Sequence, residues 1–163
     1  MKYFRTIAVL GIIGLFYSSC EKKASYPDVP IITYNNFYCD SACLRINFTD
    51  GNGDIGYPSQ QESAPPNFYA AVLAFVYKTQ TYDSLITFSY NVPYITPSGN
   101  DKELNGIIQI NFEGLLNEWV TQDTAQFSKV ADLSRLEFKV WLYDRAGNKS
   151  NVLITPPQRY PCQ

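Results

Sequence analysis

Hydrophobic and polar residues alternate along most of the chain, which is the pattern of a strand with one buried face. The alternation is strict over Leu44–Thr49 and recurs over Ile108–Phe112 and Leu136–Tyr143. The nearly continuous apolar run Phe68–Tyr77 predicts a strand buried on both faces, although periodicity alone also allows a helix there. Three further strands are expected at 31–34, 84–94 and 151–155.

Turn-forming residues separate these runs. Glycines follow the second run, two prolines precede the third, and Gly147-Asn148 separates the last two. Only 115–120, before the sixth run, has a helical pattern. About seven short alternating strands joined by turns are typical of a β-sandwich. We therefore predict an all-β fold, an immunoglobulin/fibronectin-like antiparallel β-sandwich of about seven strands, as a single domain over 30–163.

The N-terminus has the layout of a secretory signal. Lys2 and Arg5 precede the apolar run 6–16, which is shorter than the roughly 20 residues of a membrane span. Small residues then lead to Cys20, an arrangement that resembles a bacterial lipobox, whose cysteine is acylated. We expect a signal peptide at 1–19, then a lipidated Cys20 and tether over 20–29 that attach the protein to a membrane. An ordinary cleaved signal with an incidental cysteine is the alternative.

Charge and composition restrict the function classes. The net charge is −2 and no basic patch is present, so a nucleic-acid partner is not expected. The chain has no histidine, which removes Ser-His-Asp and Cys-His catalysis and histidine-ligated zinc. We predict no enzymatic activity, no catalytic residues and no required cofactor. The enzymatic alternative is a hydrolase that uses the carboxylates of Asp50, Asp54 or Asp144.

Three cysteines follow Cys20, namely Cys39, Cys43 and Cys162. An exported protein is in a compartment that permits disulfides, and three thiols allow at most one internal bond. Cys39 and Cys43 can close a small loop, or Cys162 can attach the C-terminal segment to either of them. A thiol left over is expected to pack as a small hydrophobic side chain.

Oxygen-bearing side chains alternate with glycines directly after the second strand. Asp50, Asn52 and Asp54 form a D-x-N-x-D spacing that resembles the start of an EF-hand calcium loop. The pattern then departs from such a loop, because Ile55 stands where glycine is expected and Gln61 where the bidentate glutamate is expected. The alternative is that these side chains cap their own turns.

Two stretches, FTDGNGDIG and YDRAGNKSN, resemble segments of a family of uncharacterised Bacteroidetes lipoproteins. Members carry a DGDGDIG-like stretch after an early strand and a DRAGNKSN-like turn before their last strand. The second stretch is also similar to the terminal hairpin turn of many bacterial immunoglobulin-like and fibronectin-like modules. The resemblance implies an immunoglobulin-like sandwich and a lipid anchor in the outer membrane, but it implies no activity.

The expected topology relates the two stretches. If Leu44–Thr49 is strand B and Leu136–Tyr143 is strand F, both run in the same direction on facing sheets. The loops that follow them then emerge at the same end, which places Asp144 and Asn148 near the Asp50–Asp54 loop. Asp144 is therefore expected to complete a structural calcium site with an affinity of roughly 10⁻⁴–10⁻³ M. The opposite end is expected to gather the three cysteines that follow Cys20.

Surface chemistry leaves two further hypotheses open. The aromatic residues are either sandwich core or a surface that stacks on sugars or contacts a protein; they are Phe68, Tyr69, Tyr77, Tyr82, Tyr90, Tyr94 and Trp141. Three Asp-Ser/Thr tripeptides in expected turns resemble O-glycosylation acceptors, at Ser41, Ser84 and Thr124, or are ordinary turns. The predicted function is a non-enzymatic, lipid-anchored cell-envelope module for binding or assembly with a protein or glycan partner. A carbohydrate-binding accessory lipoprotein is the alternative, and the membrane face stays open.

Overall fold

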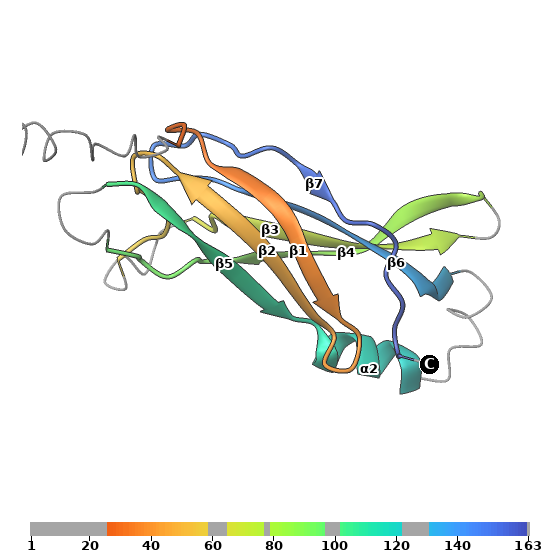
Figure 1. Ribbon diagram of the computed structural model, residues 1–163. Helices are drawn as coiled ribbons and strands as arrows, with labels where there is room; N and C mark the ends of the chain where they lie inside the picture. The colour runs from red at the N-terminus through yellow and green to blue at the C-terminus, as the bar shows by residue number, and fades with distance from the viewer. Residues whose placement is uncertain (1–25, 59–64, 77–78, 97–101, 122–130, 163) are drawn as a thin grey trace, which may run out of the picture.

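The computed structural model describes residues 26–58, 65–76, 79–96, 102–121 and 131–162, without the side chains of 119–121 and 131–133. These parts contain seven strands and one helix: β1 (Ile31–Tyr38), β2 (Cys43–Asp50), β3 (Phe68–Val76), β4 (Thr81–Tyr90), β5 (Leu104–Asn111), α2 (Glu113–Thr121), β6 (Ala131–Leu142) and β7 (Leu153–Ile154). They form two antiparallel sheets, β1-β2-β5 and β4-β3-β6-β7 (Figure 1). The predicted all-β sandwich of about seven strands is confirmed.

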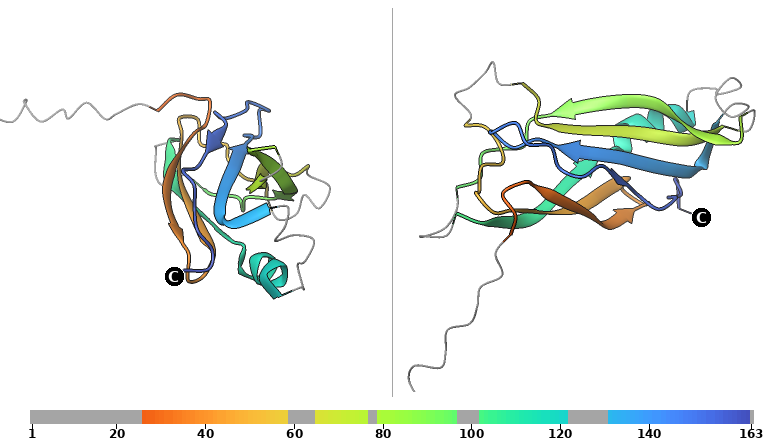
Figure 2. Two further views of the ribbon diagram at one scale, coloured as in Figure 1. Left: turned by 90° about the vertical axis from the view of Figure 1, so that its right-hand side faces the viewer. Right: turned by 90° about the horizontal axis from the view of Figure 1, so that it is seen from above.

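The core lies between the two sheets, which Figure 2 shows as separate layers. The inward residues of β2 (Leu44, Ile46 and Phe48) are buried, as the alternating pattern predicts. Phe138 of β6 connects the layers, because its ring lies 5.1 Å from that of Phe37 and 4.9 Å from that of Phe112. Burial of each such side chain contributes about 1.5–3 kcal/mol, so these contacts stabilise the sandwich.

β3 is a central strand between β4 and β6, which explains its continuous apolar sequence. The helix that periodicity also allowed at this position is excluded. The strand expected over 84–94 is shifted, because the antiparallel pairing of β3 with β4 begins at Thr81 and ends at Tyr90. β5 begins at Leu104, which pairs with Asp50 before the alternation in its own sequence starts. Backbone hydrogen bonding thus extends β4 and β5 beyond the residues whose hydrophobic and polar side chains alternate.

β7 is shorter than expected, and side chains replace part of its backbone pairing with β6. The hydroxyl oxygen of Ser150 accepts a hydrogen bond from the Leu142 amide at 3.0 Å. Thr155 accepts one in the same way from the Phe138 amide at 3.0 Å. Both hydroxyl side chains are buried, and these bonds satisfy the requirement that buried polar groups have partners.

The two ends of the sandwich carry different structures. α2 begins after Asn111, whose Oδ1 accepts a hydrogen bond from the Glu113 amide at 2.7 Å as a helix cap. It lies at the end that also holds the β1–β2 turn and the C-terminus (Figure 1). The opposite end holds the loops that follow β2 and β6. In the described part of the chain, no helix has the length and apolar character to cross a membrane.

Candidate metal centre

The loop after β2 and the turn after β6 meet at one end of the sandwich. The Arg145 amide donates to the carbonyl oxygen of Asp54 at 3.0 Å, and the Ala146 amide donates to Asp54 Oδ2 at 3.2 Å. Carboxylate oxygens of Asp50, Asp54 and Asp144, one from each, lie within 4.8 Å of one another. The structure therefore brings together the three aspartates that the strand topology placed at this end.

Some of these carboxylate oxygens accept hydrogen bonds within the turns, and others have no hydrogen-bond partner. Asp50 Oδ2 accepts a hydrogen bond from the Asp54 amide at 2.8 Å. Asp144 accepts two bonds of 2.7 Å from Asn148, one from its amide and one from its side chain. The capping alternative thus accounts for part of the cluster. Among the described residues, the Oδ1 atoms of Asp50, Asn52 and Asp54 are buried and have no hydrogen-bond partner.

Burial makes this cluster electrostatically costly. Asp50 and Asp144 are fully buried, and Asp54 is partly buried. Burial, with a smaller contribution from the charges of Asp54 and Asp144, raises the pKa of Asp50 to about 6. Burial and then the charge of Asp144 also raise the pKa of Asp54, against the Ala146 amide and the Arg145 charge. The ionised cluster is therefore short of positive charge.

The side chain of Arg145 stabilises the loop after β2 by binding the loop's backbone carbonyl groups. Its Nη1 donates to the carbonyl oxygens of Gly56 at 2.8 Å and Ile55 at 3.3 Å. Its guanidinium also lies 5.0 Å from the ring centre of Tyr94. The sequence analysis did not identify Arg145, because no local pattern shows which distant carbonyl groups an arginine reaches.

Two glycines of the loop are required by close backbone contacts. A Cβ atom at Gly51 would collide with the backbone of Tyr26 and Pro27, and the Gly51 amide donates to the Pro27 carbonyl at 2.8 Å. Gly56 has a φ of 81°, and a Cβ there would collide with the Pro93 carbonyl. The loop is therefore packed against the segment that enters β1 and against the segment after β4.

Of the three cysteines that follow Cys20, two form a disulfide and one is a free thiol. Cys39, after β1, forms a disulfide with Cys162 near the C-terminus. This is the C-terminal attachment that the sequence left open beside a Cys39–Cys43 loop. Cys43 is a buried free thiol, and burial raises its pKa. Cys20, the expected lipid-attachment residue, lies outside the described residues.

The expected glycosylation acceptors differ in their surroundings. Ser41 lies in the β1–β2 turn, is partly buried, and its hydroxyl donates to Asp40 Oδ1 at 3.2 Å. Ser84 is exposed but lies within β4, where it pairs with Leu73, so the turn expected at this position is wrong. Asp83 and Ser84 continue the pairing with β3, which the short Asp-Ser motif does not reveal. Thr124 lies outside the part that the structure describes.

Aromatic side chains on the outer face of β3 and β6 stack on one another. The rings of Tyr69 and Trp141 are 5.3 Å apart with an interplanar angle of 4°. Lys149 Nζ lies 5.1 Å from the Trp141 ring centre and 5.9 Å from that of Tyr143. Tyr69 and Lys149 belong to segments on opposite sides of β6, and Trp141 between them is half-buried. This cluster is not a row of open rings of the kind that stack on sugars.

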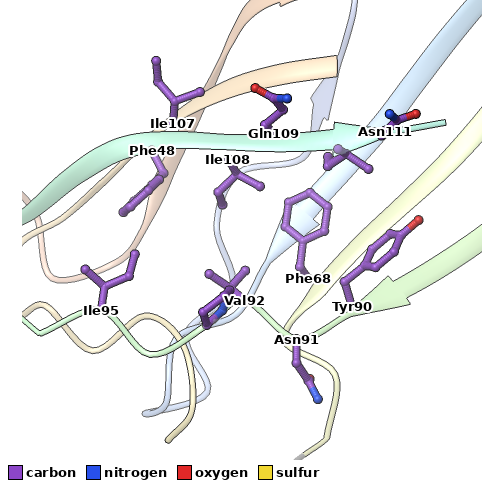
Figure 3. Close-up of a pocket in the computed structure, with 12 residues that line it drawn as sticks. Phe48, Phe68, Tyr90, Asn91, Val92, Ile95, Ile107, Ile108, Gln109 and Asn111 are labelled. Atoms are coloured by element: carbon purple, nitrogen blue, oxygen red, sulfur yellow. The ribbon is translucent and has the colours of Figure 1, made fainter. Parts of the chain in front are cut away.

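A cavity of about 400 Å³ opens between the edges of the two sheets, beside β4 and β5. Side chains that point into it in Figure 3 include Phe48, Ile95 and Ile108, whereas Ile107 and Gln109 point away. Its remaining lining residues are Phe68, Tyr90, Asn91, Val92, Pro93, Ile110 and Asn111. Among the described residues that line the cavity, none is charged and none belongs to the aspartate cluster.

The geometry of these two sites is the basis for any functional assignment. Comparison with family models, with curated proteins and with solved structures finds no match for this chain. The metal cluster combines residues that the sequence analysis named. The cavity combines residues from four segments, and of these the sequence analysis named only Phe68 and Tyr90 as candidate binding residues.

Proposed function

We propose that this protein is an exported, lipid-anchored module of a bacterial cell envelope that binds a ligand or partner and is not an enzyme. The Cys39–Cys162 bond supports export, because disulfides persist in oxidising compartments. The lipobox-like sequence ending at Cys20 supports the anchor. The outer membrane is the proposed membrane, following the resemblance of the two sequence stretches.

The segment that leads to the lipid anchor would be attached at the end of the domain that carries the aspartate cluster. The Pro27 carbonyl accepts a hydrogen bond from Gly51, so the last part of the expected tether is held at this end. An anchor attached here directs the opposite end, with α2 and the β1–β2 turn, away from the membrane (Figure 1). The cavity lies along the side of the sandwich and stays accessible in this orientation.

The observation that carries the binding function is the cavity between β4 and β5. Its volume of about 400 Å³ falls within the range of small-molecule sites, roughly 300–1,000 Å³. Its interior is apolar, and its polar lining residues are neutral amides and one tyrosine. The complementary ligand is therefore an uncharged molecule with an apolar part. A carboxylate-based hydrolase gains no support from this cavity, whose described lining residues include no acidic side chain.

The carbohydrate-binding alternative has one observation in its favour. Asn91, Asn111 and the exposed Tyr90 lie at the cavity, and amides with an aromatic ring are common in sugar sites. However, Asn111 Oδ1 already accepts the helix-capping bond from Glu113, and Trp141 on the outer face is half-buried and stacked on Tyr69. The geometry therefore favours an apolar ligand over a sugar.

Two experiments test the lipid anchor and the membrane face. Cells that express the full chain are fed an alkyne-tagged fatty acid, and the chain is expected to incorporate it, whereas Cys20→Ala is not. Protease treatment of intact cells then assigns the membrane face. An unlabelled wild-type chain that leaves the membrane with salt washing would contradict the anchor.

The ligand class is tested with the neutral apolar probe N-phenyl-1-naphthylamine. We expect saturable fluorescence enhancement, weakened about tenfold by Ile108→Trp, which fills the cavity. Ile107→Trp adds the same side chain to the same strand but on its outer side (Figure 3), and it is expected to leave the affinity unchanged. Equal effects of both variants, or binding of neutral oligosaccharides instead of the probe, would refute the apolar-ligand assignment.

A further inference from the structure

We propose that Asp50, Asn52, Asp54 and Asp144 bind one calcium ion, which joins the β2–β3 loop to the β6–β7 turn. Two independent observations support this site. The first is the convergence of three carboxylates within 4.8 Å. The second is the fully buried Asp50 side chain, whose Oδ1 has no partner among the described residues. Buried polar atoms in folded proteins nearly always have a partner, so this oxygen indicates a ligand.

The unpartnered atoms offer oxygen donors from one loop. The Oδ1 atoms of Asp50, Asn52 and Asp54 come from alternate positions of one loop, and all three are buried. The Oδ2 atoms of Asp50 and Asp54 each accept a hydrogen bond from a backbone amide. These bonds fix the orientation of both carboxylates and leave their Oδ1 atoms available to an ion. Asp144 contributes from the facing turn. A carboxylate oxygen has two lone pairs, so Asp144 can accept from Asn148 and still bind an ion.

Charge balance favours a cation at this position. Three carboxylates are buried or partly buried together, and burial of like charges without compensation is strongly unfavourable. Arg145 is the cation beside Asp54, but its Nη1 is directed to the carbonyl groups of Ile55 and Gly56. A divalent ion supplies the missing positive charge and binds the oxygens directly.

The donor chemistry and the spacing select calcium. All four side chains offer oxygen, the ligand of hard cations, and the cluster contains no sulfur or nitrogen ligand of the kind that zinc prefers. Oxygens on opposite sides of a calcium ion are about 4.6–5.2 Å apart, twice the usual calcium–oxygen distance, against about 4.0–4.2 Å for magnesium. The three carboxylate oxygens lie within 4.8 Å of one another, which is compatible with a calcium shell.

The ion would act on three segments of the chain at once. It would join the β2–β3 loop to the β6–β7 turn directly. Because Gly51 of this loop donates to the Pro27 carbonyl, the segment that enters β1 is held through the same loop. Gly56, on the other side, packs against Pro93 at the cavity. Calcium is therefore a structural ion that orders one whole end of the sandwich.

The test uses the full chain, purified in detergent and freed of metal by chelator. Equilibrium dialysis at about 5 mM calcium is expected to find one bound ion per chain, with a dissociation constant of roughly 0.1–1 mM. The melting temperature is expected to rise by about 3–8 °C with calcium. Magnesium at the same concentration is expected to give a much smaller shift. Equal effects of both ions would overturn the calcium assignment, and an unliganded wild-type chain would overturn the site.

Two matched variants locate the ion. Asp54→Asn removes one ligand charge and is expected to weaken calcium binding at least about tenfold. Asp28→Asn removes the same charge from an exposed position near the segment that packs on the loop, and is expected to change binding less than about twofold. Equal weakening by both variants would show diffuse ion attraction and overturn the site. Binding to the wild-type chain is measured independently of how either variant folds.

Discussion

The backbone amide of Arg145 donates a hydrogen bond to the carbonyl oxygen of Asp54 at 3.0 Å, which connects two loops that are far apart in the sequence. The side chain of Arg145 continues along the same loop to the carbonyl groups of Ile55 and Gly56. One residue thus binds three successive carbonyl groups of the β2–β3 loop. The junction of the two loops does not depend on the aspartates alone.

Replacement of Arg145 by alanine is expected to lower the free energy of unfolding by about 1–3 kcal/mol, because charge-assisted bonds to partly buried carbonyl groups are lost. Arg145→Lys is expected to recover part of this loss, since a lysine cannot reproduce the planar geometry of the guanidinium. Urea unfolding measures both changes. Lys102→Ala, at an exposed loop position, serves as the control. An Arg145→Ala protein as stable as the control would contradict the assigned contacts.

The metal-free protein is expected to become more stable as the pH falls from about 7.5 to 5. The pKa of Asp50 is raised by burial from 3.8 to about 6, so the folded protein binds a proton more tightly than the unfolded chain. The resulting stability is complete below the unfolded pKa and is lost as the pH rises through the folded pKa. The full shift corresponds to about 3 kcal/mol, and about half of this gain is expected by pH 5. Urea unfolding with chelator at several pH values measures it.

Asp50→Asn separates the destabilisation by the buried Asp50 charge from the role of this residue in metal binding. The variant is expected to be more stable than the wild type in chelator near pH 7.5, because a buried charge is removed while an acceptor for the Asp54 amide remains. It is also expected to lose the stabilisation by calcium. The two effects have opposite signs in one protein. A variant that is destabilised equally with and without calcium would indicate a turn-capping role only.

Loss of the Cys39–Cys162 bond is expected to lower the free energy of unfolding by about 3–5 kcal/mol, because the closed loop is long. The two cysteines are separated by 123 positions in the sequence. Cys162→Ala is compared with Cys43→Ala by urea unfolding, since the second variant removes a buried thiol without breaking a bond. Equal stability of Cys162→Ala and the wild type would show that the bond does not constrain the chain.

The Cys43 thiol is expected to be unreactive in the folded protein. Its side chain is buried, and this burial raises its pKa, so little reactive thiolate is present at neutral pH. In a Cys20→Ala chain, reaction with Ellman's reagent is expected to be at least about a hundred times slower in buffer than in denaturant. Rapid labelling of the folded chain would contradict the burial of the Cys43 side chain.

Alternation predicted the strands because each buries one face, and the positions of β2 and β6 followed from it. The bounds were less accurate where the alternation is interrupted. β1 extends to Tyr38 across an irregularity between Tyr34 and Asn36. β5 starts before Gly106, a residue that faces the Phe48 ring and adds no side chain to the pattern.

Proximity of Asp144 to the Asp50–Asp54 loop was predictable because it follows from strand direction. The bonds of Arg145 and the close contacts of Gly51 and Gly56 were not, since they depend on the final distance between segments. The cavity was not predictable for the same reason. Its lining combines Phe48 of β2 with Ile108 of β5 and Val92 after β4, and no sequence pattern relates these positions.

The two sheets are connected along one long side. Asn151, just before β7, binds both backbone groups of Ile32 in β1, accepting at 2.8 Å and donating at 2.9 Å. The disulfide of Cys39 joins the same strand region to the C-terminal segment. On the opposite side, β4 and β5 are edge strands of different sheets with the cavity between them. The cavity therefore lies on the side of the sandwich opposite to the one that Asn151 and the disulfide hold together, so a ligand can reach the core without breaking either link.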